Sequence, residues 1–290
     1  MKHKLYLFII AVFICTSLVA QTETEIKSLK VGDNTVYLIY ETEFATPTSV
    51  LSSVKGETFT LEEDTAMLAA CSFLIKTPEA NILVDVGVGF YENKSVLIDK
   101  LNKLGVKRDE IDLILITHAH LNHISGLLDN EGKVAFPNAD LYISKEDSDY
   151  WLDQKGMYER HKARAKRVPP LFDPYKAINK FKTFEANATL PYGIKSIAAH
   201  GHTMGHTVYT LSGGGKEIWF VGDIIHFTGI QFDHPYLSPT YDTHPEDATK
   251  ARHKLFKNAA EKKVVLAASH AFDFFKVENK DGKIISVPVD

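Results

Sequence analysis

Apolar residues along this chain fall in short runs that turn-forming and charged positions interrupt. Runs rich in β-branched and aromatic residues predict strands, whereas the spacing of Val96, Leu97, Leu101 and Leu104 predicts a helix that stops at Gly105. The fully apolar run at 113–117 predicts a central strand covered on both faces. Further strands are expected at 36–40, 72–76, 81–86, 140–143, 194–199, 207–211, 218–221 and 264–267, and further helices at 145–152, 158–166 and 246–260.

The alternation of strands and helices indicates a layered α/β fold. The chain has 290 residues, of which 44% are hydrophobic, so it can bury a sizeable core and disorder is excluded as its main state. We find no internal repeat or linker, and residues 27–290 are expected to form one domain. Because 37 acidic residues outnumber 33 basic ones, the net charge of -4 gives no electrostatic case for a nucleic-acid partner.

The first twenty residues differ from the rest of the chain in composition. Lys2 and Lys4 precede a long apolar run, and small residues then lead to Ala20. This pattern predicts a cleaved signal peptide at residues 1–20, a periplasmic or secreted protein and no stable membrane anchor. A retained helical anchor is the alternative, although the apolar run is short for one. Cleavage leaves Cys71 as the only thiol, and its apolar surroundings predict a buried structural role.

Three histidines follow the predicted central strand within six residues. His118 and His120 can project to one side of an extended segment, and His123 follows in the next turn. Gathering neutral imidazoles in one place is unfavourable unless they bind a shared cation. The cluster therefore predicts a metal site at the edge of a sheet, where sites of α/β proteins usually lie, rather than a chance grouping on a polar loop.

Three later segments supply further side chains of the ligand type. His202 and His206 lie in a loop with two glycines, and Asp223 and His270 each follow a predicted strand. Four strand ends with such side chains indicate that all of them point into one cleft.

In this order the residues resemble the metallo-β-lactamase superfamily of metal-dependent hydrolases. Its pattern is HxHxDH after a strand, a GHTxGH loop, an Asp in a Gly-Asp pair and a final His, and Asp85 matches its early D-x-G turn. The resemblance covers residues 27–290, and segments 136–139, 222–226 and 231–235 are most similar to the periplasmic organophosphate hydrolase and lactonase-like branch. It implies a four-layer αβ/βα sandwich with the metals at one edge.

The resemblance also implies two zinc sites, bridged by Asp223. Asp85 and His206 would support the ligands through outer hydrogen bonds. The first zinc ion would be bound by His118, His120 and His202, and the second by His123 and His270, with residue 122 completing the second set. The other histidines have no ligand position and are expected to be solvated or to line the pocket: His161, His200, His226, His234, His244 and His253.

One position departs from the family pattern. Asn122 stands where the family has an aspartate that ligates the second metal and orients the nucleophilic water. A neutral amide leaves the dizinc site one charge more positive, and a hard dication prefers a carboxylate. We therefore expect one or two zinc ions per chain, with the second held weakly. A compensated natural variant, a degenerate family member and an introduced Asp→Asn change fit the sequence equally well.

The implied activity is hydrolysis by a metal-bound hydroxide, with Asp223 and Asn122 at the catalytic centre. A catalytically impaired metal-binding protein of the same fold stays open, a β-lactamase is a weaker option, and a homodimer is left open. An aromatic pocket would favour small hydrophobic lactones, esters or phosphotriesters. The aromatic residues expected near the site are Phe90, Tyr91, Trp151, Phe227, Phe232, Phe272, Phe274 and Phe275.

Residues 160–167 form the one basic run of the chain. Most runs of this kind are solvated helix faces, and that is our expectation here. Binding of RNA, as in the nuclease branch of the superfamily, is poorly supported by an acidic, exported chain. The following Val-Pro-Pro at 168–170 is expected to break the helix and to mark a mobile insertion over the cleft.

Overall fold

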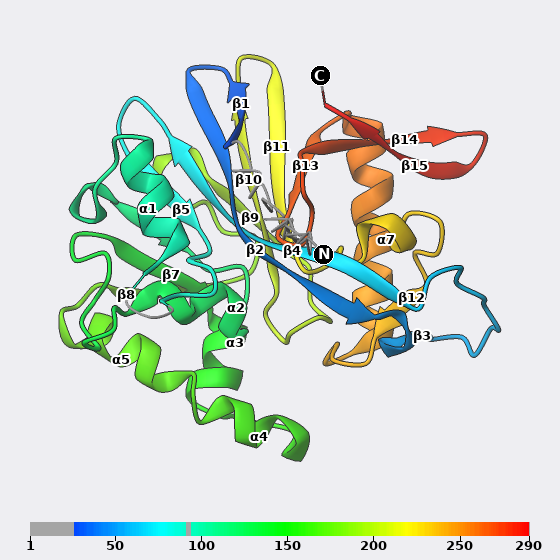
Figure 1. The fold of residues 1–290 in the computed structure, drawn as a ribbon, viewed down its shortest axis with the longest axis horizontal. Coiled ribbons are helices and arrows are strands. Elements are labelled where there is room, and N and C mark those ends of the chain that lie inside the picture. The colour runs from blue at the N-terminus through cyan, green and yellow to red at the C-terminus, as the bar shows by residue number, and fades with distance from the viewer. Residues whose placement is uncertain (1–25, 91–93, 290) are drawn as a thin grey trace, which may run out of the picture.

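The computed structural model describes residues 26–90 and 94–289. The predicted signal peptide at 1–20 and Tyr91 lie outside these residues. Two β-sheets pack against each other in the middle of the molecule, with α1 (Val96–Lys103) and α5 (Pro169–Ala177) outside one sheet and α7 (Pro245–Lys262) outside the other (Figure 1). This is the expected αβ/βα sandwich.

The first sheet has seven strands and changes from antiparallel to parallel pairing along its width. Its order is β1-β2-β4-β5-β6-β7-β8, and β5, β6, β7 and β8 run parallel. The carboxyl ends of these parallel strands therefore lie at one edge of the sheet. The strands are β1 (Lys27–Val31), β2 (Asn34–Pro47), β4 (Thr65–Lys76), β5 (Asn81–Val84), β6 (Leu113–Leu115), β7 (Asp140–Ser144) and β8 (Phe181–Phe184).

The second sheet has six strands in the order β15-β14-β13-β11-β10-β9. Its strands β11 and β13 are parallel, so the segments that follow them leave the sheet at the same edge. A separate two-stranded sheet pairs β12 with β3. The strands are β9 (Lys195–Ala198), β10 (Thr207–Gly213), β11 (Lys216–Gly222), β13 (Val265–Ala268), β14 (Phe275–Lys280), β15 (Lys283–Pro288), β3 (Leu51–Ser53) and β12 (Leu237–Pro239).

The helices begin and end where the local sequence provides caps. The Ser95 hydroxyl accepts a hydrogen bond from the Ile98 N–H and starts α1, and Gly105, with φ of 70°, follows its end. The remaining helices are α2 (Leu121–Ile124), α3 (Lys145–Asp147), α4 (Glu159–Ala165) and α6 (Thr228–Gln231), with a π turn at Ser148–Leu152 and 3₁₀ turns at Thr48–Val50, Arg108–Glu110, Ser125–Leu127 and Pro191–Gly193.

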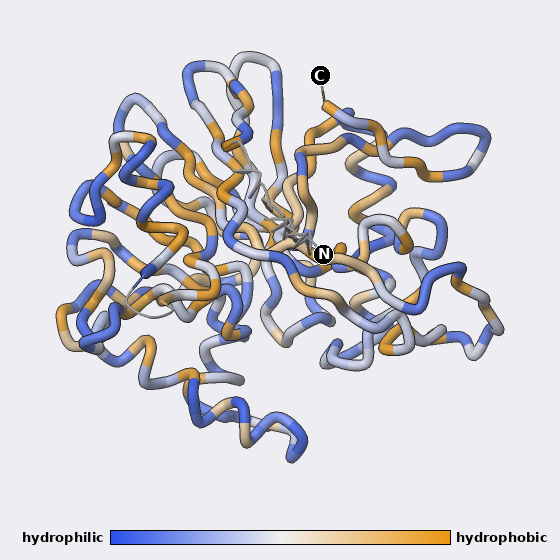
Figure 2. Tube along the Cα trace, in the orientation of Figure 1, coloured by the Kyte–Doolittle hydropathy of each residue, from blue (hydrophilic) through white to orange (hydrophobic). Residues whose placement is uncertain are grey.

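Apolar side chains fill the space between the sheets and beneath the outer helices. Phe73 of β4 and Phe220 of β11 meet between the sheets with ring centroids 5.4 Å apart. Hydrophobic segments concentrate on the central strands, whereas α4 is largely hydrophilic (Figure 2). Cys71 is a buried free cysteine, as expected, and burial raises the pKa of its thiol. No helix in the described part of the chain is long and apolar enough to cross a membrane.

Every predicted strand and helix is present, but several boundaries differ. The strands expected at 81–86 and 113–117 end at Val84 and Leu115, and the helix expected at 145–152 is α3 followed by the π turn. Pro169 and Pro170 come shortly after the end of α4 at Ala165 and begin α5, because a proline in the first turn gives up no hydrogen bond. The expectation of a simple break there was incomplete.

Candidate metal centre

Four buried side chains from the two sheets converge at the shared edge of the sandwich. His118 Nε2 lies 3.1 Å from His120 Nδ1, which lies 3.0 Å from His202 Nε2. Asp223 Oδ2 is 3.7 Å from the nitrogen of His118 and 3.4 Å from that of His202. These separations are close to the edges, roughly 3.3 Å, of a tetrahedron with zinc–nitrogen bonds of about 2.0 Å.

The chemistry of this donor set fits a zinc ion. Burial first, and the charges of neighbouring histidines next, hold the pKa values of His118 and His120 well below their usual range. Both rings are therefore neutral, and each turns a nitrogen toward the others, where a lone pair can face a cation. Three imidazoles with room for one more ligand are the set that catalytic zinc takes.

A second group shares Asp223 with the first. His123 Nε2 lies 3.2 Å from Asp223 Oδ1, and His270 Nε2 lies 3.0 Å from Asp223 Oδ2. His123 Nε2 and Asp223 Oδ1 are buried and have no hydrogen-bond partner among the described residues. Buried polar atoms without partners are rare in native proteins, and a cation between them would satisfy both. The two groups together hold six of the seven predicted ligand residues.

The seventh predicted ligand, Asn122, lies at the wall of the same cleft. It is on the short helix α2, is partly buried and lines the cavity beside His120 and His270. Its amide makes no side-chain hydrogen bond within residues 26–90 and 94–289. The structure thus places Asn122 next to the second group without tying its amide to any other side chain.

Hydrogen bonds from outside orient the second group. Asp85 accepts a hydrogen bond from His123 Nδ1 at 2.7 Å and two more from the N–H and hydroxyl of Thr117 at 2.8 Å. His270 Nδ1 donates to the Ala69 carbonyl at 2.5 Å. Each of these bonds leaves Nε2 of the histidine free to face Asp223, as ligating histidines require. The supporting role expected for Asp85 fits this geometry.

The first group has its own outer support. Asp242, in the loop after β12, accepts a hydrogen bond from His202 Nδ1 at 2.6 Å. His206 Nε2 accepts one from the Asp223 N–H at 3.0 Å, so His206 positions the shared carboxylate from behind. The outer role expected for His206 agrees with this contact. Asp242 was not expected from the sequence, because nothing near it along the chain marks it as a partner of His202.

A buried carboxylate joins the two histidine loops. Asp147 Oδ2 accepts the Ala119 N–H at 2.8 Å, and its Oδ1 accepts the Gly205 N–H at 2.7 Å. The approach requires glycine, because a Cβ on residue 205 would lie 2.2 Å from the Ser144 hydroxyl and 2.3 Å from the Asp147 nitrogen. Asp147 therefore fixes the loop of the first sheet against that of the second.

Electrostatics inside the centre favour a proton on His123 when no metal is bound. Burial opposes the charged imidazolium, but Asp223 and Asp85 outweigh it and raise the pKa of His123 to about 10. Burial likewise opposes the charge on Asp223, whereas the histidines around it hold its pKa well below the usual range. A metal ion that binds His123 must displace this proton, so its affinity rises with pH.

The cleft above the centre has a volume of about 620 Å³. Phe44 of β2 and Tyr241 are the aromatic residues of its wall, and neither was expected there. Tyr241 follows β12, and its hydroxyl is buried without a hydrogen-bond partner in the described chain. The residues that line the cleft are Phe44, Thr46, His120, Leu121, Asn122, Ala163, Arg164, Arg167, His202, Asp223, His226, Tyr241 and His270.

Most aromatic residues predicted at the site pack elsewhere. Trp151 is buried behind His120, with ring centroids 5.3 Å apart, and therefore supports a ligand rather than facing substrate. Phe272 is 41% exposed on the surface, and Phe90 packs partly buried against the core under the helices. The others are buried in the hydrophobic cores and are absent from the cleft wall: Phe227, Phe232, Phe274 and Phe275.

Of the histidines without a ligand position, His226 enters the cleft. Its Nδ1 is 3.2 Å from Asp223 Oδ2, and its ring centroid lies 3.9 Å from that of His270. Burial, more than the nearby charges, lowers the pKa of His226 to about 3, so the ring is neutral. The remaining five lie outside the cleft wall: His161, His200, His234, His244 and His253.

The basic run at 160–167 is not simply a solvated face. Arg164 and Arg167 line the cleft, whereas Lys162 on the other side of α4 pairs with Glu159 at 2.6 Å. Both arginines are exposed, as expected for a solvated face, but they also border the cleft, which the sequence did not predict.

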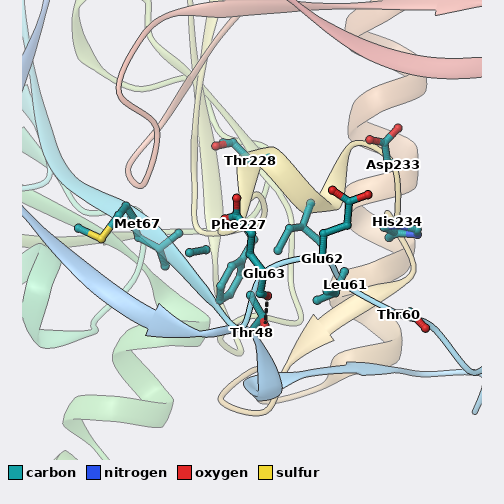
Figure 3. Close-up of a pocket in the computed structure, with 14 residues that line it drawn as sticks. Thr48, Thr60, Leu61, Glu62, Glu63, Met67, Phe227, Thr228, Asp233 and His234 are labelled. Atoms are coloured by element: carbon teal, nitrogen blue, oxygen red, sulfur yellow. Dashed lines mark hydrogen bonds between the residues drawn. The ribbon is translucent and has the colours of Figure 1, made fainter.

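A second cavity of about 600 Å³ lies away from the metal centre and shares no lining residue with it. Its wall carries Glu62, Glu63, Asp233 and His234, and Met67 lies at its other end (Figure 3). The potential ligand clusters found among the described residues do not include these side chains. The cavity thus contrasts with the cleft in charge and has no part in the metal centre.

The two-sheet sandwich with a His/Asp centre at one edge defines a metal-dependent hydrolase fold. The sequence model described as "Metallo-beta-lactamase superfamily" matches residues 68–270, more than half of the chain, and the chain belongs to this superfamily. It is a hydrolase of that superfamily by its family match and its structural neighbours.

Solved structures agree over nearly the whole chain. The hydrolase AbOPH is 26% identical with a TM-score of 0.82, and AidC, a dizinc quorum-quenching lactonase in complex with a product, is 28% identical with a TM-score of 0.77. Each match covers 91% of this chain and 97% of the other. A probable metal-dependent hydrolase from Staphylococcus aureus, 21% identical with a TM-score of 0.72 over 90% of this chain and 99% of that one, shows the fold alone.

Curated relatives match over shorter regions. Endoribonuclease YSH1 of Yarrowia lipolytica is 31% identical over 119 residues, which are 39% of this chain and 14% of that protein. The probable metallo-hydrolase Mb2322c of Mycobacterium bovis is 20% identical over 184 residues, which are 54% of this chain and 56% of the relative. The matched regions thus span less than two thirds of either relative.

Proposed function

We propose that this chain is a zinc-dependent hydrolase of small lactones, esters or phosphotriesters. The observation that carries the proposal is the convergence of two His/Asp groups on the shared Asp223 at the floor of a cleft. The likeness to AbOPH and to the dizinc lactonase AidC supports the metal and the substrate class. A periplasmic or secreted location, inferred from residues 1–20, is part of the same proposal.

In this proposal the first ion is bound by His118, His120 and His202. The second ion is bound by His123 and His270, and Asp223 is shared by both. The bound metal would polarise the substrate oxygen and lower the pKa of a water to about 7. The protein's own contribution is orientation, since Asp85, Asp242 and His206 hold the ligands from outside.

Tyr241 is the side chain best suited to contact the substrate directly. Burial, with the charges of Asp223 and Asp242, raises the pKa of its phenol, so the hydroxyl keeps its proton. The unpartnered hydroxyl lies in the wall of the cleft and can donate to a carbonyl or phosphoryl oxygen. We assign Tyr241 a role in binding that oxygen.

Asn122 supports a second candidate, a metal-binding protein of the same fold with impaired catalysis. The second group lacks the carboxylate that the family pattern has at this position, and Asn122 offers only a neutral amide. A chain that keeps one metal and the pocket but hydrolyses slowly fits this feature. The two candidates differ in turnover, since each keeps at least one bound metal ion.

The test is elemental analysis of the purified protein, combined with hydrolysis of an acyl homoserine lactone, an aryl ester and an aryl phosphotriester. We expect about one firmly bound zinc per chain and measurable hydrolysis of one of these substrates. Asn122→Asp should raise both second-metal affinity and hydrolysis by about 10- to 100-fold. Asn102→Asp, the same change at an exposed position of α1, is the matched control.

Two outcomes would contradict the proposal. A wild-type protein that binds zinc but hydrolyses none of the three substrates, with Asn122→Asp restoring turnover, would favour the impaired binding protein. No gain in metal affinity or hydrolysis from Asn122→Asp would remove the explanation given for this position.

A further inference from the structure

One face of α4 and the turn after it borders the metal centre. Arg160, Ala163, Arg164 and Arg167 are spaced three and four apart, so they share one side of the helix. Ala163, Arg164 and Arg167 belong to the cleft wall, together with the ligands His120, His202 and Asp223. The basic run therefore brings two guanidinium groups to the rim of the cavity in which the reaction would occur.

Hydrogen bonds hold this segment against the site. Arg160 Nη2 donates to the Thr243 carbonyl at 2.9 Å, one residue beyond the Asp242 that orients His202. The Tyr158 hydroxyl lies 3.1 Å from His244 Nε2, and the Tyr150 hydroxyl 2.6 Å from His161 Nδ1. These bonds hold the N-terminal end of α4 against the neighbouring loop and the π turn, next to the arginines.

The two guanidinium groups have no hydrogen-bonding or ion-pair partner in the described part of the chain. Across residues 26–90 and 94–289, neither Arg164 nor Arg167 forms an ion pair or a side-chain hydrogen bond, whereas Lys162 and Arg160 both have partners. Asp223 is the one acidic residue of the described cleft wall, and the histidine ligands surround it. With even one divalent cation bound, the cleft carries an excess of positive charge that the arginines increase.

We propose that Arg164 and Arg167 bind a carboxylate of the substrate, and that the enzyme prefers esters or lactones that already carry this group. The proposal rests on the hydrolase function above and narrows its substrate class. Guanidinium groups present parallel N–H donors that match a carboxylate in two-point contacts, and unpaired ones attract it over several ångströms. The scissile carbonyl would then lie over the metal centre while the carboxylate stays at the rim.

Hydrolysis of two matched substrates tests this preference in the zinc-loaded protein. One is the nitrophenyl half-ester of adipic acid, which has a free carboxylate, and the other is its methyl-capped neutral counterpart. We expect kcat/KM at least about 10-fold higher for the anionic substrate. R164A/R167A should lower kcat/KM for that substrate by about 10- to 100-fold, mainly through KM, and leave the neutral one within about 2-fold.

The matched control removes the same charge from the same segment. Lys162 and Lys166 are exposed and absent from the cleft wall, and K162A/K166A should change neither substrate by more than about 2-fold. R164K keeps the charge but not the two-point contact. It should therefore retain part of the wild-type preference for the anionic substrate. Equal losses on both substrates, or no loss on either, would overturn the proposal.

A binding measurement separates this proposal from the proposed function. Calorimetry on zinc-loaded protein compares adipamic acid, with one carboxylate, to adipamide, with none. We expect adipamic acid to bind about 10-fold more weakly to R164A/R167A than to wild type or K162A/K166A, even if no ester is hydrolysed. Unchanged binding would overturn the role of the arginines, and tight binding of phenyl phosphate without adipamic acid would overturn the carboxylate assignment.

Discussion

The two ligand groups of the metal centre share Asp223 but differ in completeness. In the first, the His120 nitrogen lies 3.1 Å from that of His118 and 3.0 Å from that of His202, and Asp242 orients His202. In the second, two histidines face the shared carboxylate, and a neutral amide, Asn122, occupies the wall beside them. One centre can thus combine a position for firm binding with one whose occupancy depends on conditions.

The largest expected effect comes from removing a ligand of the complete group. His120→Ala should lower zinc affinity and hydrolysis by more than about 100-fold, because even outer-sphere changes cost about 10- to 100-fold. Elemental analysis and kcat/KM measure it. His253→Ala, on the exposed side of α7, is the control and should leave both unchanged. Retention of a full zinc ion by His120→Ala would show that the first group is not the firm site.

A smaller effect is expected from the carboxylates that orient each group. Asp242→Asn should lower the affinity for the first ion, and Asp85→Asn that for the second, each by about 10- to 100-fold. Each substitution removes a carboxylate charge that accepts a hydrogen bond from a histidine of the group. Zinc release to a graded chelator, followed as two phases, distinguishes them. Thermal melting of both variants checks that the fold is kept. If both variants weakened the same phase, the division into two groups would be wrong.

The smallest effect is the pH dependence of stability. Burial, more than nearby charge, lowers the pKa values of His206 and His226 to about 3, below their unfolded value of about 6.5. The unfolded state therefore takes up protons first, and the metal-free protein loses stability as pH falls from about 6.5. Burial raises the pKa of Glu41 to about 7, which offsets part of this loss between about 4.5 and 7.

Above neutrality the metal-free protein instead loses stability as the pH rises. With its pKa raised to about 10, His123 stabilises the fold at lower pH, and this contribution is lost as pH rises from about 6.5 to 10. Zinc replaces that proton, so the gap in unfolding free energy between zinc-loaded and metal-free protein should widen over this range. Urea unfolding with and without zinc measures the gap, and a constant gap would contradict the role of His123 in metal binding.

The sequence was sufficient to predict that six His and Asp side chains converge, because each follows a strand or lies in a glycine-bounded loop. His118 and Asp223 are marked by the apolar runs before them, and those runs also predicted the order of the elements. No comparable sequence pattern pointed to Asp147 or Asp242. Their importance arises from tertiary placement, since each lies far along the chain from at least one group that it contacts.

Side-chain direction was the other limit. The pattern could identify aromatic residues after Asp223 but not which of them face the cleft, and Phe227 packs into a core while Tyr241 lines the wall. The basic run shows the same difficulty. Its charge predicted exposure to solvent, and Lys162, Arg164 and Arg167 are all exposed. Only the two arginines also border the cleft, and that depends on how the segment packs against the loop at Thr243.

The potential ligands of the centre come from both halves of the sandwich. His118, His120 and His123 follow β6 of one sheet, whereas Asp223 and His270 follow β11 and β13 of the other. Metal binding by the two groups would cross-link the halves much as a disulfide does, in a chain whose described part has a single, buried cysteine. By mass action it adds stability that grows with the logarithm of free metal concentration. Scarcity of the metal would then shorten the lifetime of the folded protein as well as slow its turnover.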